Sequence, residues 1–169
     1  IKDNKGLILY AHTSNYKVVG FTQEVEINEL ANLAKRKKIP LLADIGSGAV
    51  ADLSGTNIPY EKMVEEYIHA GVDVVSFSGD KLLGGVQSGI IVGKKKIIKK
   101  IHNDPIYRAL RCDKITFAIL DSILRTYKSA REVSHNNLTH RLFLRDVGEL
   151  SEMGNKILSL IKKENIKKY

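Results

Sequence analysis

Two apolar segments separated by a short turn rich in glycine and serine constrain this sequence most. Residues 72–77 and 89–93 are rich in Val, Ile and Phe, which is typical of strands buried in a sheet. The turn between them carries Lys81 directly after Gly79 and Asp80. Small residues let the backbone approach a ligand closely, and ligands of open α/β sheets bind at strand ends. The segment therefore predicts an α/β sheet that displays Lys81 at the end of a strand.

A second polar residue ends another apolar run. Asp44 follows segment 40–43 and precedes the glycine-containing segment 45–48. Pyridoxal phosphate enzymes need a lysine that forms an imine with the cofactor and a carboxylate that keeps the pyridine nitrogen protonated. An aspartate ending a central strand, followed by a strand and a Ser-x-x-Lys turn, is the order found in fold-type I enzymes, and Ser78 supplies that serine. Taken alone, Lys81 is an exposed lysine and Asp44 a capping residue; together they predict a pyridoxal phosphate site.

The rest of the hydrophobic pattern alternates strands and helices. Apolar spacing and boundary residues predict strands over 7–11, 40–43, 72–77, 89–93 and 142–144, helices over 27–37, 61–70, 94–101, 114–131 and 150–163, and a polar hinge or loop over 132–139. Such alternation indicates a three-layer α/β domain with a mostly parallel sheet. Fold-type I enzymes carry one antiparallel strand just after the lysine, and we expect segment 89–93 to be that strand.

The charge of the chain is unevenly distributed. The net charge is +8, and residues 94–131 hold 11 Lys or Arg and three Asp. A stretch of this kind contacts an RNA backbone or an anionic substrate, or it is the solvent-facing side of an amphipathic helix. The sequence has no run of about 18 apolar positions, so no membrane contact is expected. The single cysteine, Cys112, suits a reducing compartment, and we expect a cytoplasmic protein. The histidines lack metal-ligand spacing, so no metal site is predicted.

Four stretches of the chain match a known family, in the family's order. They are His12 to Thr22, Asp44 to Gly48, Phe77 to Gly93 and Arg108 to Lys114. With these motifs the chain resembles the bacterial selenocysteine synthases, the L-seryl-tRNA(Sec) selenium transferases. The resemblance covers most of residues 7–127, and the lysine turn and the Arg-Ala-Leu-Arg stretch are its most specific parts.

The resemblance implies a role for each matching residue around the cofactor. Lys81 would form the imine with pyridoxal phosphate, and Asp44 would pair with the pyridinium nitrogen. Ser78 would help to hold the cofactor phosphate, and Asp80 would be an accessory acidic group in catalysis beside the lysine.

Four further residues carry alternatives that the sequence leaves open. Arg108 and Arg111 would bind the incoming selenium-bearing anion, because guanidinium groups grip oxyanions with paired donors; otherwise they are solvated arginines on a basic helix. His12 and Asn15 also follow an apolar strand, so they would line the cofactor pocket, or they are hydrogen-bonded core or loop groups.

The resemblance also implies an activity. Seryl-tRNA(Sec) would be converted to selenocysteinyl-tRNA(Sec) through an aminoacrylyl intermediate on pyridoxal phosphate, with selenophosphate as the selenium donor, in a homo-oligomer. A pyridoxal phosphate lyase acting on a small amino acid or amino sugar phosphate, and an inactive scaffold, remain alternatives.

The resemblance bears on domain organisation too. Members of the family are considerably longer at both ends, so we expect this chain to be an internal fragment. Residues 1–131 would belong to the cofactor-binding large domain, which lacks its N-terminal part here, and residues 132–169 would start a small α+β domain.

Overall fold

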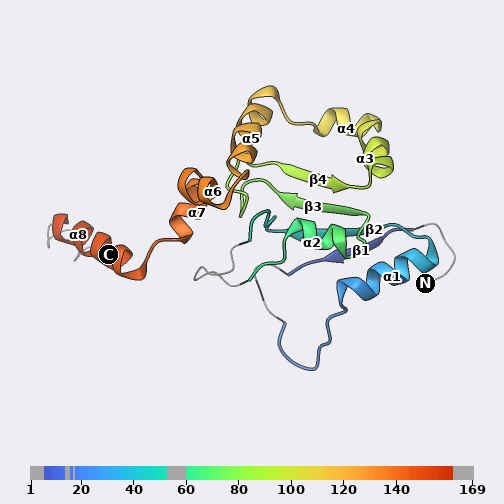
Figure 1. The fold of residues 1–169 in the computed structure, drawn as a ribbon, viewed down its shortest axis with the longest axis horizontal. Coiled ribbons are helices and arrows are strands. Elements are labelled where there is room, and N and C mark those ends of the chain that lie inside the picture. Colours follow the sequence, from blue (N-terminus) through green and yellow to red (C-terminus); the bar gives the residue numbers. More distant parts are fainter. Residues whose placement is uncertain (1–5, 14–15, 17, 53–59, 162–169) are drawn as a thin grey trace.

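The computed structural model of the chain describes residues 6–13, 16, 18–52 and 60–161. These residues form a four-stranded sheet with the strand order β1-β2-β3-β4 (Figure 1). Strands β1 (Ile8–Ala11), β2 (Leu41–Gly46) and β3 (Val74–Ser78) are parallel, whereas β4 (Gly89–Gly93) is antiparallel to β3. The antiparallel strand directly after the lysine turn is therefore confirmed.

One face of this sheet forms the hydrophobic core. Alternate residues of β2, namely Leu41, Ala43 and Ile45, are almost completely buried, as the two-residue period of a strand requires. Helices α1 (Ile27–Lys37) and α2 (Val64–His69) lie over this face (Figure 1). Their buried residues join the same apolar cluster as β2 and β3: Ile27, Ala31, Ala34 and Tyr67.

The opposite face of the sheet carries side chains that remain accessible. Leu9 is 60% exposed and Ile91 is 45% exposed, and Asp44 is exposed between them. Within the described residues, helices therefore cover the core face, and the face that carries Asp44 stays open.

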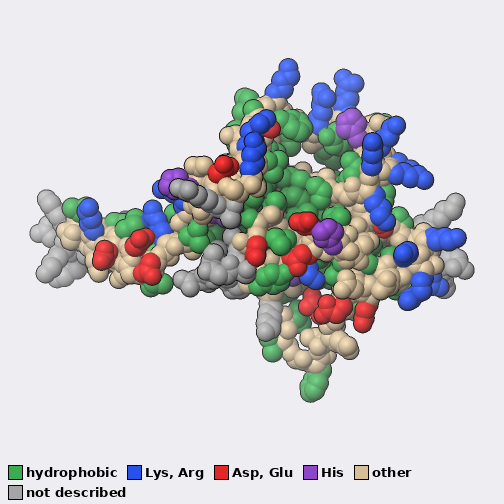
Figure 2. Space-filling view, viewed as in Figure 1, with side chains coloured by type: hydrophobic (Ala, Val, Ile, Leu, Met, Phe, Trp, Pro, Cys, Tyr) green, Lys and Arg blue, Asp and Glu red, His purple; other side chains and the backbone are tan. Residues whose placement is uncertain are grey.

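Three helices follow the sheet in sequence and lie beyond the β4 edge: α3 (Lys95–His102), α4 (Pro105–Leu110) and α5 (Lys114–Thr126) (Figure 1). Because β4 is antiparallel, α3 starts at the amino-terminal edge of the parallel strands, opposite the lysine turn. Helix α5 then returns toward that turn, and its Leu120 packs in the core cluster with Leu83. Basic side chains gather over α3 and α4 and at the end of α1, whereas acidic ones lie around α2 (Figure 2).

The C-terminal part of the chain differs from the sequence prediction. The predicted loop over 132–139 and the predicted strand over 142–144 are wrong, because the segment forms helices α6 (Ala130–Asn136) and α7 (Leu138–Phe143). Side-chain caps explain both helices. The Ser129 hydroxyl accepts from the Glu132 amide, and the Asn137 carbonyl oxygen accepts from the Thr139 and His140 amides.

The boundaries of the other helices and strands differ less from the sequence prediction. The helix predicted over 114–131 ends at Thr126, and the last helix, α8, spans Val147–Leu160 because Asp146 caps it. Helix α2 is shorter than predicted, whereas α1 and β4 match their predicted ranges. Among the described helices, none has both the length and the apolar content needed to cross a bilayer.

Candidate active site

The carboxyl ends of three parallel strands bring the predicted site residues to one edge of the sheet. His12 follows β1, Asp44 lies in β2, Ser78 ends β3 and Lys81 lies in the turn after β3. Backbone hydrogen bonds join these segments: the His12 amide donates to the Asp44 carbonyl at 2.9 Å, and the Leu82 amide donates to the Ser47 carbonyl at 3.1 Å. The turn after Asp44 and the turn that bears Lys81 are therefore in direct contact.

Asp44 is held in place by a residue that the sequence analysis did not single out. The Ser76 hydroxyl donates to Asp44 Oδ1 at 3.1 Å, because the two residues are register partners on adjacent strands. The second carboxylate oxygen has no hydrogen bond among the described residues, and Asp44 is exposed. A polar residue in the middle of an otherwise apolar strand was the signal in the sequence that could have identified Ser76.

The lysine turn is a compact structure built from glycines. The Gly84 amide donates to the Lys81 carbonyl at 2.8 Å, and the Gly85 amide donates to the Gly79 carbonyl at 2.8 Å. Leu83 is fully buried and anchors the turn in the core, whereas Asp80 and Lys81 are exposed. Neither Asp80 nor Lys81 forms an ion pair with any described residue. The Lys81 amine is thus available for covalent chemistry.

Ser78 ends β3 opposite Gly89 and is partly exposed. Its hydroxyl has no hydrogen bond within the described residues, so it could donate to an anion at this edge. Its role in phosphate binding is still a prediction.

His12 lies in a small polar group on the same edge. Its Nε2 is 3.5 Å from Glu61 Oε1, and the same oxygen accepts a hydrogen bond from the Ser47 hydroxyl. The ring stacks with Tyr10 at 6.4 Å between centroids. His12 Nδ1 is buried and lacks a hydrogen-bond partner among the described residues. Sequence reasoning missed Glu61 and Ser47. Asn15, the other predicted pocket residue, lies outside the described residues.

Arg108 and Arg111 are not joined to the lysine turn by the described contacts. Arg108 lies in α4, which is close to α3 at the far end of β4 from Lys81 (Figure 1). Arg111 is the extended C-cap residue of that helix, and both side chains are exposed. Arg111 lines a hollow of about 380 Å³ together with Ser88 and Leu120. Their role as anion ligands therefore stays a prediction.

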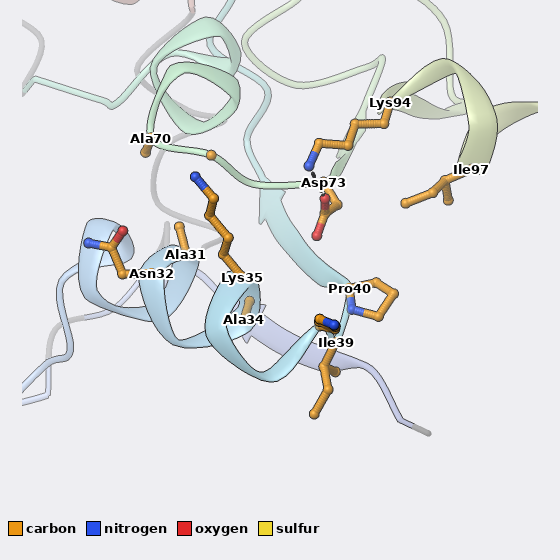
Figure 3. Close-up of a pocket in the computed structure, with 12 residues that line it drawn as sticks. Ala31, Asn32, Ala34, Lys35, Ile39, Pro40, Ala70, Asp73, Lys94 and Ile97 are labelled. Atoms are coloured by element: carbon orange, nitrogen blue, oxygen red, sulfur yellow. Dashed lines mark ion pairs between the residues drawn. The ribbon is translucent and has the colours of Figure 1, made fainter. Parts of the chain in front are cut away.

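A cavity of about 480 Å³ lies at the opposite, amino-terminal edge of the sheet (Figure 3). It is lined by Lys35, Pro40, Asp73 and Lys94 among others, and Lys94 Nζ is 2.5 Å from Asp73 Oδ1. Asp73 Oδ2 also accepts from the Leu41 amide at 2.8 Å. The acidic group in this cavity is thus used to hold β2 and the start of α3 together.

The residues at the carboxyl edge fit pyridoxal phosphate. Two turns that contact each other carry a carboxylate oriented by a neighbouring hydroxyl, together with a lysine and a buried imidazole nitrogen that have no partner among the described residues. In the part of the chain that the structure describes, no group of three or more His, Cys, Asp or Glu is placed to hold a metal ion.

The fold and this edge define a class of protein. The α/β architecture with a mostly parallel sheet matches solved structures, so the predicted fold-type I class is confirmed. D-Glucosaminate-6-phosphate ammonia-lyase matches with a TM-score of 0.53 and 23% identity over 74% of this chain and 32% of that one. A serine palmitoyltransferase from S. paucimobilis matches with a TM-score of 0.53 and 15% identity over 78% of this chain and 32% of that one.

Sequence comparison assigns the family within that class. The family model described as L-seryl-tRNA selenium transferase matches residues 1–169, and the chain belongs to this family. The L-seryl-tRNA(Sec) selenium transferase of Carboxydothermus hydrogenoformans is 54% identical over 75% of this chain. Those of Proteus mirabilis and Clostridium perfringens are 45% identical over 94% and 98% of the chain. The chain spans 27%, 34% and 36% of the lengths of these three relatives.

Proposed function

We propose that the chain is part of a pyridoxal phosphate-dependent selenium transferase that converts seryl-tRNA(Sec) to selenocysteinyl-tRNA(Sec) with selenophosphate. The observation that carries this proposal is the family match over residues 1–169, combined with Asp44 and the Lys81 turn at one edge of the sheet. The relatives are about three times as long as the chain. The activity is therefore proposed for a protein of the relatives' length that contains this chain, called the full-length protein below.

Some residues of the site hold the cofactor, and others move protons. When bound, pyridoxal phosphate supplies a ring that accepts electrons from the substrate. Lys81 attaches the cofactor and then moves a proton at the substrate α-carbon. Asp44, oriented by Ser76, keeps the pyridine nitrogen protonated. Ser78 donates to the phosphate, and Asp80 is the accessory acidic group beside the lysine.

The remaining predicted residues act around this centre. His12 and Asn15 line the cofactor pocket, and this role is supported by His12 Nδ1, which has no partner among the described residues. Arg108 and Arg111 bind the selenium-bearing anion, and their exposure without ion pairs among the described residues leaves both guanidinium groups available.

Assembly, domain division and location complete the proposal. The full-length protein is a homo-oligomer, which is supported by apolar side chains that stay exposed on α5 and α8, among them Ile115, Phe117 and Leu160. Residues 1–131 belong to the large domain and residues 132–169 begin the small one, since α8 lies away from the sheet (Figure 1). A charged tRNA substrate and one unpaired cysteine suit the cytoplasm.

The decisive test uses the full-length protein with pyridoxal phosphate, serine-charged tRNA(Sec) and selenophosphate. We expect selenocysteinyl-tRNA to form with the wild-type protein and with Lys37→Ala, a control at the exposed end of α1. Lys81→Ala should form none, because no amine remains to attach the cofactor.

Three results would contradict the proposal. Formation of selenocysteinyl-tRNA by Lys81→Ala would show that Lys81 is not required to attach the cofactor. A protein that binds pyridoxal phosphate at Lys81 but makes no selenocysteinyl-tRNA would instead be a lyase for a small substrate, and one that binds no cofactor would be a scaffold. The names of the relatives do not favour either alternative.

A further inference from the structure

Three side chains from the C-terminal part of the chain hold the carbonyl groups of the two residues after Lys81: Tyr127 at the end of α5, Asn137 between α6 and α7, and His140 in α7. The Tyr127 hydroxyl donates to the Leu83 carbonyl at 2.9 Å, and Asn137 Nδ2 donates to the same oxygen at 2.9 Å. His140 Nε2 lies 3.1 Å from the Leu82 carbonyl and 3.0 Å from the Tyr127 hydroxyl. The donors come from positions 44 to 58 residues later in the chain.

The protons in this group have defined places. A carbonyl oxygen only accepts, so His140 Nε2 carries the hydrogen that points to Leu82. The hydrogen of Tyr127 is directed to Leu83, and the Tyr127 oxygen shares the single Nε2 hydrogen of His140 with the Leu82 carbonyl. Burial lowers the pKa of His140 and raises the pKa of Tyr127 to about 12, so both side chains are neutral at physiological pH. The contacts therefore form one network in which each hydrogen of the Tyr127 hydroxyl and of His140 Nε2 is directed to an acceptor.

The turn is held against Asn137 by shape as well as by hydrogen bonds. Gly84 has a φ of +69°, and a Cβ atom there would lie 2.4 Å from Asn137 Oδ1. Asn137 is completely buried, and this oxygen accepts from the amides of Thr139 and His140. From the other side, the Ser47 carbonyl accepts from the Leu82 amide. The turn is thus fixed between the segment after Asp44 and the start of α7.

We propose that Tyr127, Asn137 and His140 are positioning residues that direct Lys81 toward the cofactor, which rests on the proposed function. The Lys81 side chain has no partner among the described residues, so the backbone of its own turn determines where the amine points. The network binds the carbonyl groups of Leu82 and Leu83, the two residues that follow Lys81. Displacement of a reacting group by about 1 Å can slow a reaction about 100-fold.

The test measures how fast Lys81 captures pyridoxal phosphate in the full-length protein from which cofactor has been removed. Borohydride reduction at set times fixes the adduct, peptide mass spectrometry counts it at Lys81, and the series is repeated across pH. The variants are Tyr127→Phe, which removes only a hydroxyl, His140→Ala and His140→Gln. His135→Ala is the matched control, because His135 is exposed in the neighbouring helix α6.

We expect Tyr127→Phe and His140→Ala to slow capture about tenfold or more, since each variant removes one of the hydrogen bonds that hold the Leu82 and Leu83 carbonyls and so lets the turn shift. His140→Gln should restore most of the rate, because its amide N–H can replace Nε2–H as donor to Leu82. The pH at which capture is half-maximal should move in Tyr127→Phe and His140→Ala and stay in place in His135→Ala. Circular dichroism establishes that each variant is folded.

Each other outcome overturns the proposal. If Tyr127→Phe folds and captures pyridoxal phosphate at the wild-type rate, with its half-maximal rate at the wild-type pH, the positioning role is excluded. This holds even if His140→Ala fails to fold. If His140→Gln slows capture as much as His140→Ala does, loss of the hydrogen bond to the Leu82 carbonyl is not the cause of the slowing. In both cases the wild-type adduct at Lys81 leaves the proposed function standing, whereas no wild-type adduct at Lys81 refutes both proposals together.

Discussion

Replacement of Gly84 by alanine tests the packing of the lysine turn most directly. A left-handed backbone conformation costs an L-residue about 1–2 kcal/mol, and Gly84 has a φ of +69°. The new methyl group would also meet Asn137, which cannot swing away because it is fully buried and hydrogen-bonded on both sides of its amide. Overpacking of this kind costs about 1–3 kcal/mol. The expected loss of local stability is about 2–5 kcal/mol.

Hydrogen exchange of the backbone amides of residues 79–86 measures this loss in the full-length protein. A loss of about 2–5 kcal/mol corresponds to exchange that is at least about 30-fold faster. Gly89→Ala is the matched control, because Gly89 adjoins the same turn but a Cβ there meets nothing within 4 Å. The control should change stability by less than about 0.5 kcal/mol. Equal exchange rates in the Gly84→Ala and Gly89→Ala proteins would refute the reasoning.

Two further predictions concern the rest of the chain. Asp73→Ala should lower the free energy of unfolding by about 1–3 kcal/mol, because the buried Leu41 amide loses its acceptor, whereas Lys94→Ala should cost less than about 1 kcal/mol, as for exposed ion pairs. Urea unfolding compares the two variants, and an equal loss would contradict this account. Burial lowers the pKa of His140 below its ordinary 6.5, so the unfolded chain binds the proton more readily and stability falls as pH drops below about 6.5. Urea midpoints of wild type and His140→Gln across about pH 5–8 should diverge on the acid side, and parallel curves would contradict the prediction.

Local patterns in the sequence were enough to predict the centre of this fold. Helix α1 has apolar residues at helical spacing, and the strands around Lys81 are apolar runs that end in glycine-containing turns. The placement of Asp44 and Lys81 at strand ends follows from the same patterns, because parallel strands present their carboxyl ends at one edge.

The helices after residue 129 show where local patterns were misread. Their polar composition favoured a loop, yet Ser129 with Glu132 three residues later is a helix-start signature that was present in the sequence. The run Leu142 to Leu144 suggested a strand by composition alone, but no strand partner lies beside it among the described residues, and α7 takes up most of it.

Tertiary structure alone decided which side chains serve the site residues. The bond from Ser76 to Asp44 depends on the register between two strands 32 residues apart in sequence. The contacts of Tyr127 and His140 with the lysine turn depend on how α5 and α7 pack against the core. Sequence periodicity reports which face of an element is buried, because burial follows the repeat of the backbone. Partners across long separations are set by packing and register, which a local pattern does not encode.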